Sequence, residues 1–219
     1  MKKYFEILKK TSLFEQIEEN DLDRMLHCLG ARVTSFDKKY TVFSEGSPAK
    51  YIGILLSGTV QILRMDYYGN RSLLEEVRPG ELFGEAFACA EVSSLPISVI
   101  ASEPSEVMLI ESSHILHTCS NNCNFHQRMI FNLMKDLAQK SLRYHRRMEV
   151  TSKRTTREKL MAYLMLCSQD ADSDSFEIPF DRQELADYLE VDRSGLSAEI
   201  GKLKKEGFIE NEKSRFRLL

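Results

Sequence analysis

The 219-residue sequence predicts an α+β fold in which a β-roll, a long helix and a small helical unit with a β-hairpin follow one another. Three observations predict this order. Short β-rich runs separated by regularly spaced glycines fill residues 31–111, which is typical of a jelly-roll-like, double-stranded β-roll. A broad apolar stripe at helical spacing follows over residues 125–148. Two amphipathic helices joined by a tight turn occupy residues 182–207.

The length of the chain suits two domains, and its hydrophobic fraction of 42% suits packed cores. The segment VTSKRT at residues 150–155 is polar and is the natural hinge. We therefore expect a β-roll domain with its helix at residues 1–150, the helix itself spanning about 120–150, and a second domain at residues 151–219.

The β-roll is predicted from its strand and turn pattern. Residues 1–27 come first and have helical apolar spacing. The β-rich runs then fall at residues 41–46, 50–66, 67–77, 95–101 and 105–111. Gly46, Gly58, Gly69 and Gly80 are separated by 12, 11 and 11 residues. The alternative for the glycines taken alone is chance spacing of common turn residues, and the strand patterns beside them favour a compact roll.

A short helix from Ser113 to about Cys119 and a long helix from Phe125 to Met148 follow the roll. The long helix carries a stripe at spacings of three, four, seven and four residues, formed by Ile130, Leu133, Leu137, Tyr144 and Met148. Such a face can cover the β-roll and also pair with a second copy of itself. The alternative is a helix that is buried only within its own chain.

The segment from Arg182 to Gly207 predicts a helix-turn-helix. Asp181 can cap the first helix, with Glu184 in the capping-box position, and Asp192 can cap the second helix. The second helix would bury its apolar face. Its outward face would present Arg193, Ser194, Ser197 and Lys202, whose donors can reach base edges or phosphates in a major groove. The alternative is an ordinary helical hairpin with a solvated face.

The last residues, FIENEKSRFRLL, predict a hairpin that turns near Lys213–Ser214, which makes the unit a winged helix-turn-helix. Lys213 and Arg215 would lie at the tip of the wing, and Arg182 at the start of the first helix completes the candidate DNA contacts. Residues 151–219 hold 12 Lys and Arg against 14 Asp and Glu, so positive charge is only local. Local patches are sufficient for phosphate contacts because salt screens each charge within about 10 Å.

The order of these parts resembles the Crp/Fnr family of bacterial transcription regulators. The resemblance covers nearly the whole chain and depends on residues 44–63, on PGELFGE at residues 79–85 and on the helix-turn-helix. It implies a cytoplasmic homodimer with an effector-sensing β-roll and a reader of two-fold symmetric double-stranded DNA, with RNA polymerase as a further partner.

The expected effector pocket lies around the PGELFGE segment and comprises Gly84, Glu85, Ala86, Phe87, Leu95, Pro96 and Ser98. In cyclic-nucleotide-binding members of the family, an Arg-Ser pair that clasps the cyclic phosphate follows this segment. Leu95 and Pro96 stand at those positions here, and neither can supply the lost charge. No Lys or Arg occurs from Pro79 to Gln127, so we expect an effector other than cAMP, if any. Arg64, Arg71 or Arg128 is the remaining source of a countercharge.

The recognition helix also departs from the family pattern. Ala198 stands where the family often has an arginine, and alanine can contact a thymine methyl but cannot bind guanine in a bidentate manner. Gly195 weakens the helix by up to about 1 kcal/mol relative to alanine. We therefore expect the operator to differ from the familiar family sites.

A cluster of potential metal ligands lies between the roll and the long helix: His114, His117, Cys119, Cys123 and His126. Imidazole and thiolate bind zinc and iron, but this spacing fits no standard zinc pattern. No cofactor is firmly implied. The alternative from another class is a metal- or thiol-responsive regulator that uses residues 114–126 as its switch.

The remaining classes are disfavoured by what the sequence lacks. It has no phosphate loop, no GxSxG elbow and no zinc-hydrolase helix, so we expect no enzyme activity. No apolar run approaches the roughly 20 residues of a membrane span. Five cysteines without a secreted framework favour a reducing cytosol.

Overall fold

The computed structural model describes residues 2–65, 67–68, 71–116 and 124–219. The chain divides into two compact units, Met1–Gln139 and Lys140–Leu219, and each is described by itself. The division falls inside the long helix, ahead of the polar segment at residues 150–155. The expected hinge at that segment stays a prediction.

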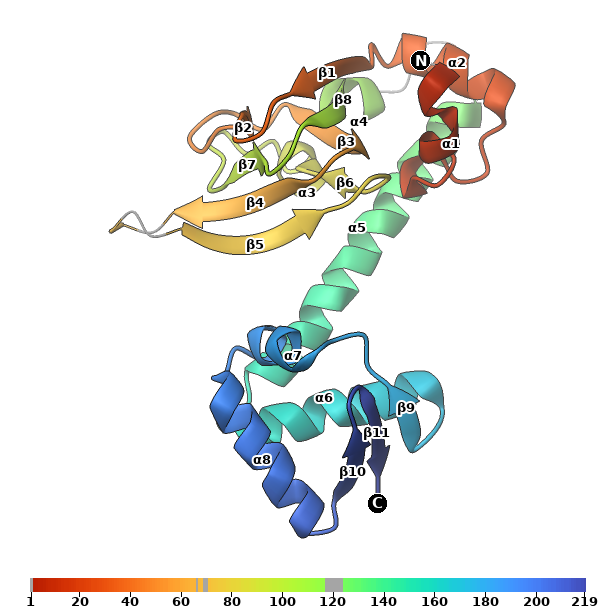
Figure 1. Cartoon of the computed structure of the whole chain (residues 1–219). Helices are drawn as coiled ribbons and strands as arrows, with labels where there is room; N and C mark the ends of the chain where they lie inside the picture. Colours follow the sequence, from red (N-terminus) through yellow and green to blue (C-terminus); the bar gives the residue numbers. More distant parts are fainter. Residues whose placement is uncertain (1, 66, 69–70, 117–123) are drawn as a thin grey trace. The chain divides into compact units, whose positions relative to one another are not determined.

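Two antiparallel four-stranded sheets form the β-roll of the first unit (Figure 1). The first sheet has the order β1-β8-β3-β6, with β1 (Arg32–Phe36), β8 (Ser105–Glu111), β3 (Tyr51–Ser57) and β6 (Leu82–Phe83). The second sheet has the order β2-β7-β4-β5, with β2 (Thr41–Phe43), β7 (Ser98–Ala101), β4 (Val60–Met65) and β5 (Arg71–Val77). The predicted roll is therefore confirmed, with β1 and β6 as short additional strands that the sequence pattern did not single out.

The apolar run IGILL in β3 is explained by burial of this strand on both faces. Ile52, Ile54 and Leu56 face a layer of helices, whereas Leu55 faces the interior between the two sheets. Gly53 is required there, because a Cβ at this position would lie 2.2 Å from the Phe83 ring. The first sheet is thus covered on both sides, and this fixes the register of its central strand.

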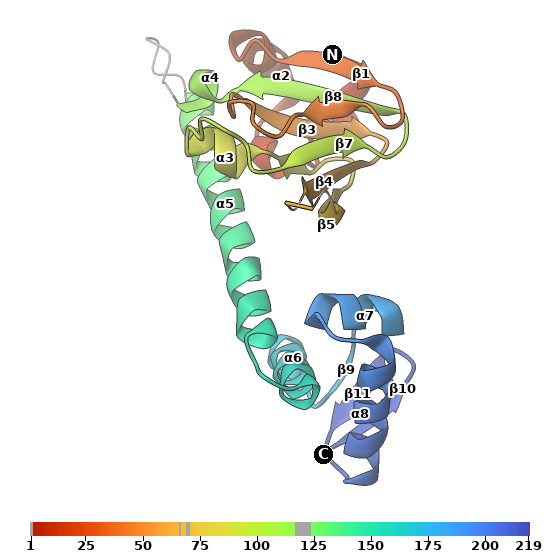
Figure 2. The same ribbon diagram turned by 90° about the vertical axis from the view of Figure 1, so that its left-hand side faces the viewer.

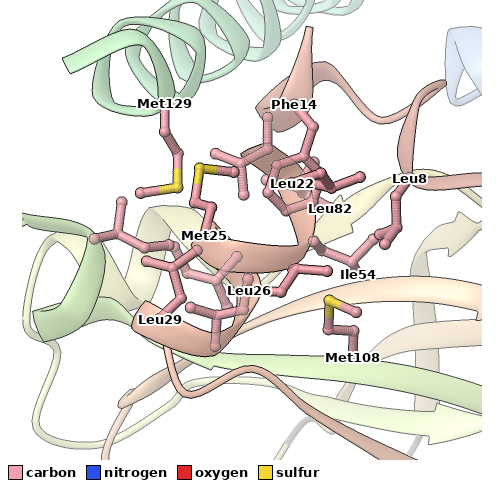
Figure 3. Close-up of a cluster of buried hydrophobic side chains, with 14 of the residues drawn as sticks. Leu8, Phe14, Leu22, Met25, Leu26, Leu29, Ile54, Leu82, Met108 and Met129 are labelled. Carbon is pink, nitrogen blue, oxygen red and sulfur yellow. The ribbon is translucent and has the colours of Figure 1, made fainter. Parts of the chain in front are cut away.

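Short helices at the amino end cover the outer face of the first sheet. They are η1 (Lys2–Tyr4), α1 (Phe5–Leu8), η2 (Ser12–Phe14) and α2 (Glu19–Cys28). Figure 3 shows Leu22, Met25 and Leu26 of α2 directed into one cluster, which Met129 of the long helix enters from the other side. The amino-terminal segment therefore joins the sheet to the long helix through buried apolar contacts.

The long helix is α5 (Asn124–Thr151), preceded by α4 (Ser112–Leu116). Its first half is anchored by polar contacts to the amino-terminal segment. The buried Asn132 amide donates to the carbonyls of Leu13 and Glu15 at 3.0 and 2.9 Å, and Ser12 donates to Asp136 at 2.7 Å. Bonds of this kind fix the rotation of α5 about its own axis.

This rotation corrects the predicted pairing stripe of α5. Leu133 is 2% exposed and Leu137 is partly buried, and both pack into the core of their own unit. The exposed apolar side chains of the helix are instead Phe131, Met134, Leu142, Tyr144 and Met148. The predicted stripe is therefore one face of the helix that the chain's own core covers only in part: Leu133 and Leu137 belong to that core, Ile130 is only half-buried, and Tyr144 and Met148 are exposed.

The second unit is a winged helix-turn-helix, seen in Figure 2 as α6, α7 and α8 beside a small sheet. Its helices are α6 (Thr156–Ala171), α7 (Arg182–Leu189) and α8 (Arg193–Lys205), and its strands are β9 (Ser175–Glu177), β10 (Ile209–Glu212) and β11 (Arg215–Leu218). The sheet has the order β10-β11-β9. Throughout the described residues, no helix combines the length and the apolarity that crossing a membrane requires.

Candidate nucleic-acid interface

Both helices of the helix-turn-helix begin at the caps that the sequence predicts. The Asp181 carboxylate accepts hydrogen bonds from the amides of Gln183 and Glu184 at 2.7 and 2.9 Å, and Glu184 accepts from the Asp181 amide at 2.7 Å. Asp192 accepts from the Gly195 amide at 2.7 Å. The Ser194 hydroxyl and the Gly195 amide hold the pKa of the Asp192 carboxyl below its usual value. The start of α8 is therefore fixed by local bonds.

The turn between α7 and α8 is held by two basic side chains from outside the motif. Glu190 adopts a left-handed conformation with φ 54°, which ends α7. Lys159 of α6 donates to the carbonyls of Leu189 and Glu190 at 3.1 and 3.3 Å. Arg147 of α5 lies 3.4 Å from the Glu190 carboxylate and over the Tyr188 ring. The end of the long helix thus contacts the turn that orients α8.

The buried face of the motif matches the sequence prediction. Leu185, Ala186 and Leu189 of α7 are buried against the matching face of α8 and against α6, where Leu160 and Leu164 are fully buried. The α8 residues of this core are Leu196, Ile200 and Leu203. Since these side chains fill the interior, the opposite edge of α8 is free for a ligand.

That opposite edge presents Arg193, Ser194, Ser197, Ala198 and Lys202, all exposed. Two of them already have partners. The Ser194 hydroxyl donates to Asp192 at 2.6 Å, so it can only accept a further hydrogen bond, and Lys202 pairs with Glu199 at 3.3 Å. Arg193 is therefore the long donor with the freest access to a base edge, and Ser197 adds a shorter one.

The wing and the start of α7 border a common cleft of about 700 Å³. Arg182 and Lys213 line it, but so do the carboxylates of Glu177, Asp181 and Glu184. Burial lowers the pKa of Arg182. The three carboxylates disfavour a phosphate inside this cleft, so the exposed outer sides of Lys213 and Arg215 are the better positions for phosphate contacts.

A second cavity, of about 460 Å³, opens at one end of the β-roll. Gly84 and Leu95 line it, as the sequence predicts, and residues 42–44 and 47–51 form most of the wall. Gly84 has φ 76°, and a Cβ there would lie 2.7 Å from the Phe43 ring. Glycine is therefore needed at this position for Phe43 to pack closely.

The other predicted pocket residues lie elsewhere. Glu85 is buried at the start of α3 (Glu85–Cys89), Ala86 is exposed, and Phe87 packs partly buried against the inner core. Pro96 is exposed, and the Ser98 hydroxyl accepts from the Glu45 amide at 3.2 Å. The structure thus brings only two of the seven predicted residues to this cavity.

Leu95 places a buried apolar side chain at a position that matters for ligand binding in the β-roll. It is 4% exposed and packs with Phe83, Val99 and Val107 in the core between the sheets. Neither Arg64 nor Arg128 lines the cavity of the roll, both being exposed elsewhere, and the side chain of Arg71 lies outside what the structure describes. An apolar group therefore occupies the position at which the family resemblance expects a guanidinium.

Two family models match the chain, one for each unit. The cyclic nucleotide-binding domain matches residues 33–122, which hold the β-roll, and the Crp-like helix-turn-helix domain matches residues 158–219. Together they cover more than half of the chain, in the order that the sequence predicts. The chain belongs to the Crp/Fnr family.

Relatives of the Crp/Fnr type agree with this membership. The "CRP-like cAMP-activated global transcriptional regulator" of Mycobacterium tuberculosis is 32% identical over 80 residues, a match that covers 36% of this chain and 35% of that protein. The Thermus thermophilus catabolite activator protein has 21% identity and a TM-score of 0.52, with 95% and 94% of the two chains covered. The c-di-GMP responsive regulator CLP of Xanthomonas campestris has 17% identity and a TM-score of 0.57, with 92% and 99% covered. The two solved structures show a shared fold.

The candidate metal ligands of this Crp/Fnr chain are placed only in part. His114 bonds the Leu29 carbonyl through Nδ1 at 2.9 Å, and His126 bonds the His114 carbonyl through Nε2 at 2.8 Å. His117, Cys119 and Cys123 lie outside the described residues. Within the parts of the chain that the structure describes, no group of three metal-binding side chains is present.

Sequence reasoning missed the residues that support the interface from other elements. Arg147 and Lys159 reach the turn from α5 and α6, 43 and 30 residues away from Glu190 and Leu189 along the chain. No local motif marks them. The only available signal is the cluster of basic residues that begins before the polar segment at residues 150–155.

Proposed function

We propose that the chain is a DNA-binding transcription regulator that acts in the cytoplasm as a homodimer on a two-fold symmetric operator. The observation that carries this proposal is the exposed edge of α8, led by Arg193, at the end of a doubly capped helix-turn-helix. A helix of this kind enters a major groove with the residues of its first turns against the base edges.

The charge pattern of the winged unit supports recognition of DNA through specific side-chain contacts rather than through a large net positive charge. The unit is not basic overall, and some of its lysines and arginines near the motif pair with carboxylates, as Arg157 does with Glu199 and Glu206. Arg193 and Ser197 have no such partner among the described residues. A guanidinium on an exposed helix edge can bind guanine O6 and N7 together.

Pairing of two chains through α5 is supported by its exposed apolar side chains. Phe131, Met134 and Leu142 are 53, 58 and 63% exposed, and they recur at helical spacing on one side of the helix. Large apolar residues in such a row are typical of a helix that packs against another copy of itself. A dimer would place two winged units on two half-sites of one operator.

Control by an effector is proposed to use the β-roll, but not through the cyclic phosphate clasp. The M. tuberculosis relative is named as cAMP-activated. In this chain the buried, apolar Leu95 replaces the charged partner that a cyclic phosphate needs. The proposed effector therefore differs from cAMP. It acts by binding one arrangement of the winged units better than another, and contacts to RNA polymerase then follow from where the operator lies.

The decisive experiment is selection of duplexes from a random pool, followed by binding assays on the recovered sequence. The native chain should recover a two-fold symmetric site. The double variant Arg193→Ala, Ser194→Ala should lose its preference for that site, whereas the control Arg24→Ala, an exposed arginine of α2, should keep it. Equal discrimination by all three proteins would overturn the proposal.

Dimerisation is tested separately by light scattering. The native chain of 25.3 kDa should have twice that mass in solution. Met134→Glu should lower the mass to that of one chain, because a charge would be buried in the apolar contact. Met165→Glu, at a similarly exposed methionine of α6, is the matched control and should leave the mass unchanged.

A further inference from the structure

The cavity at the end of the β-roll is a preformed space rather than a gap beside a loose loop. Its wall from Ser44 to Tyr51 is tied to the opposite segment by three backbone hydrogen bonds. The Gly46 amide donates to the Leu95 carbonyl at 2.9 Å, the Leu95 amide to the Ser47 carbonyl at 2.8 Å, and the Ala49 amide to the Val92 carbonyl at 2.9 Å. A volume of about 460 Å³ lies within the range of roughly 300–1,000 Å³ that small-molecule sites have.

The inner wall of this cavity is apolar. Val42, Phe43, Ala49, Leu95 and Leu109 line it, and the Phe43 ring is held against the Phe83 ring at a centroid distance of 5.3 Å. All five belong to the core cluster between the two sheets or pack on it. The body of a ligand that fills the space must therefore be apolar.

The rim of the cavity is polar and carries a single sign of charge. Lys50 is the one cation among the lining residues, and no Asp or Glu lines this cavity. Within the described residues, neither the Lys50 ammonium nor the Ser44 hydroxyl has an ion pair or a side-chain hydrogen bond. Both side chains are exposed and can turn toward a ligand at the mouth of the cavity. One ammonium and one hydroxyl suit one anionic group.

We propose that this cavity binds a monocarboxylate with an apolar chain or ring, whose carboxylate meets Lys50 and Ser44 while its body contacts Phe43, Leu95 and Leu109. The role of this ligand as the regulator's effector rests on the proposed function. Binding itself does not, because the site is complete within the β-roll. A cyclic nucleotide fits less well, since the parts of its ribose and base that reach the inner wall would meet Phe43, Leu95 and Leu109, whose side chains offer no hydrogen-bond partners.

The test is calorimetric titration of the full chain, in the absence of DNA, with octanoate and with 1-octanol. Octanoate should bind at one site per chain, and the uncharged alcohol should bind more weakly. Lys50→Gln should weaken octanoate roughly tenfold and leave 1-octanol unchanged, while Lys38→Gln, an exposed lysine outside the cavity, should alter neither. Equal effects of the two lysine variants, or the absence of saturable octanoate binding, would overturn the proposal.

A second variant guards against binding elsewhere on the chain. Leu109→Trp should fill the cavity and abolish binding of both probes, and thermal unfolding should show that the roll still folds. Should Leu109→Trp unfold the roll, Ala49→Leu fills the same space with a smaller change. Persistent octanoate binding to either folded variant, or displacement of octanoate by an equal concentration of cAMP, would contradict the site. Because no DNA is present, failure here leaves the operator selection unaffected, and failure of that selection leaves this titration unaffected.

Discussion

The winged unit and the β-roll differ in the side chains that they place at their candidate binding positions, which are polar and exposed in the first and apolar in the second. In the winged unit, an exposed helix edge keeps Arg193 and Ser197 accessible, and an apolar core lies entirely behind it. In the β-roll, the position that would clasp a phosphate holds the buried Leu95. One chain can therefore combine a polar, exposed helix edge in one unit with an apolar cavity in the other, because the two sets of residues share no core.

The largest expected effect comes from substitutions that disturb one core at a time, because they test whether the two units are stabilised independently. Leu203→Ala removes a fully buried side chain of the winged unit and should lower its free energy of unfolding by about 2–5 kcal/mol. The β-roll should keep its stability, because Leu203 belongs to a separate cluster. Calorimetric unfolding of the full chain would show whether only one transition moves. Leu55→Ala should move the other transition, and a common shift of both by either variant would refute independent cores.

Base contacts and phosphate contacts of the winged unit should respond differently to substitution. Arg193→Ala should cost about 1–3 kcal/mol on the selected operator and relax the preference at one base pair. Lys213→Ala should weaken all sequences evenly and reduce the slope of log affinity against log salt by about 1. Fluorescence anisotropy at several salt concentrations measures both. Identical behaviour of the two variants would show that Arg193 contacts phosphate only.

Introducing a positive charge at position 95 tests whether the apolar side chain there is the reason that the β-roll does not favour cAMP. The double variant Leu95→Arg, Pro96→Ser should bind cAMP at least tenfold more tightly than the native chain, since a charge-assisted hydrogen bond contributes about 1.5–3 kcal/mol. Equilibrium dialysis with labelled cAMP gives the ratio, and thermal unfolding confirms that the roll tolerates the arginine. Tight cAMP binding by the native chain would show that a positive charge at position 95 is not needed for cAMP binding, and would contradict this explanation.

The support beneath the recognition helix should have a smaller effect. Lys159→Met removes the donor to the carbonyls of Leu189 and Glu190 and should lower the stability of the winged unit by about 1 kcal/mol. Urea unfolding of this variant is compared with that of Lys153→Met, an exposed lysine with no such bond in the described residues. An equal loss of stability in both variants would show that the removed positive charge, and not the hydrogen bonds of Lys159, causes the effect.

The smallest expected effect depends on pH. The folded pKa of Asp192 is lowered by the Ser194 hydroxyl and the Gly195 amide, so its stabilisation is complete above the ordinary aspartate value of about 4 and is lost as pH falls through the lowered value. Asp192→Asn should therefore differ from the native chain near pH 7 and converge with it in strong acid. Thermal unfolding from pH 7 to pH 2 follows this, with Asp174→Asn as control. A constant difference at every pH would rule out the carboxylate as its source.

Local signals explain why the winged unit could be predicted from the sequence. The caps at Asp181 and Asp192 bond amides two or three residues away, and the buried positions recur within one helix. Such patterns are complete within a short window of sequence. The positions of most β-roll strands along the chain were predictable for the same reason, from runs and turns, whereas their order within the two sheets was not.

The residues that could not be predicted depend on contacts between distant segments. The rotation of α5 is fixed by Asn132, which bonds carbonyls 119 and 117 residues away, so Leu133 and Leu137 pack in the core of their own unit rather than on the exposed face. The cavity of the β-roll joins residues 42–51 to Leu95 and Leu109 from other strands. Periodicity within one element carries no information about which neighbour covers it.

The most direct test of DNA reading is methylation interference on the selected operator, because methyl groups on guanine N7 block the major groove alone. One guanine in each half-site, about one helical turn apart, should prevent binding of the native chain when methylated. The Arg193→Ala variant should no longer distinguish methylated from unmethylated guanine at those positions. Binding that survives N7 methylation at every guanine, or that the variant and the native chain lose equally, would contradict the account.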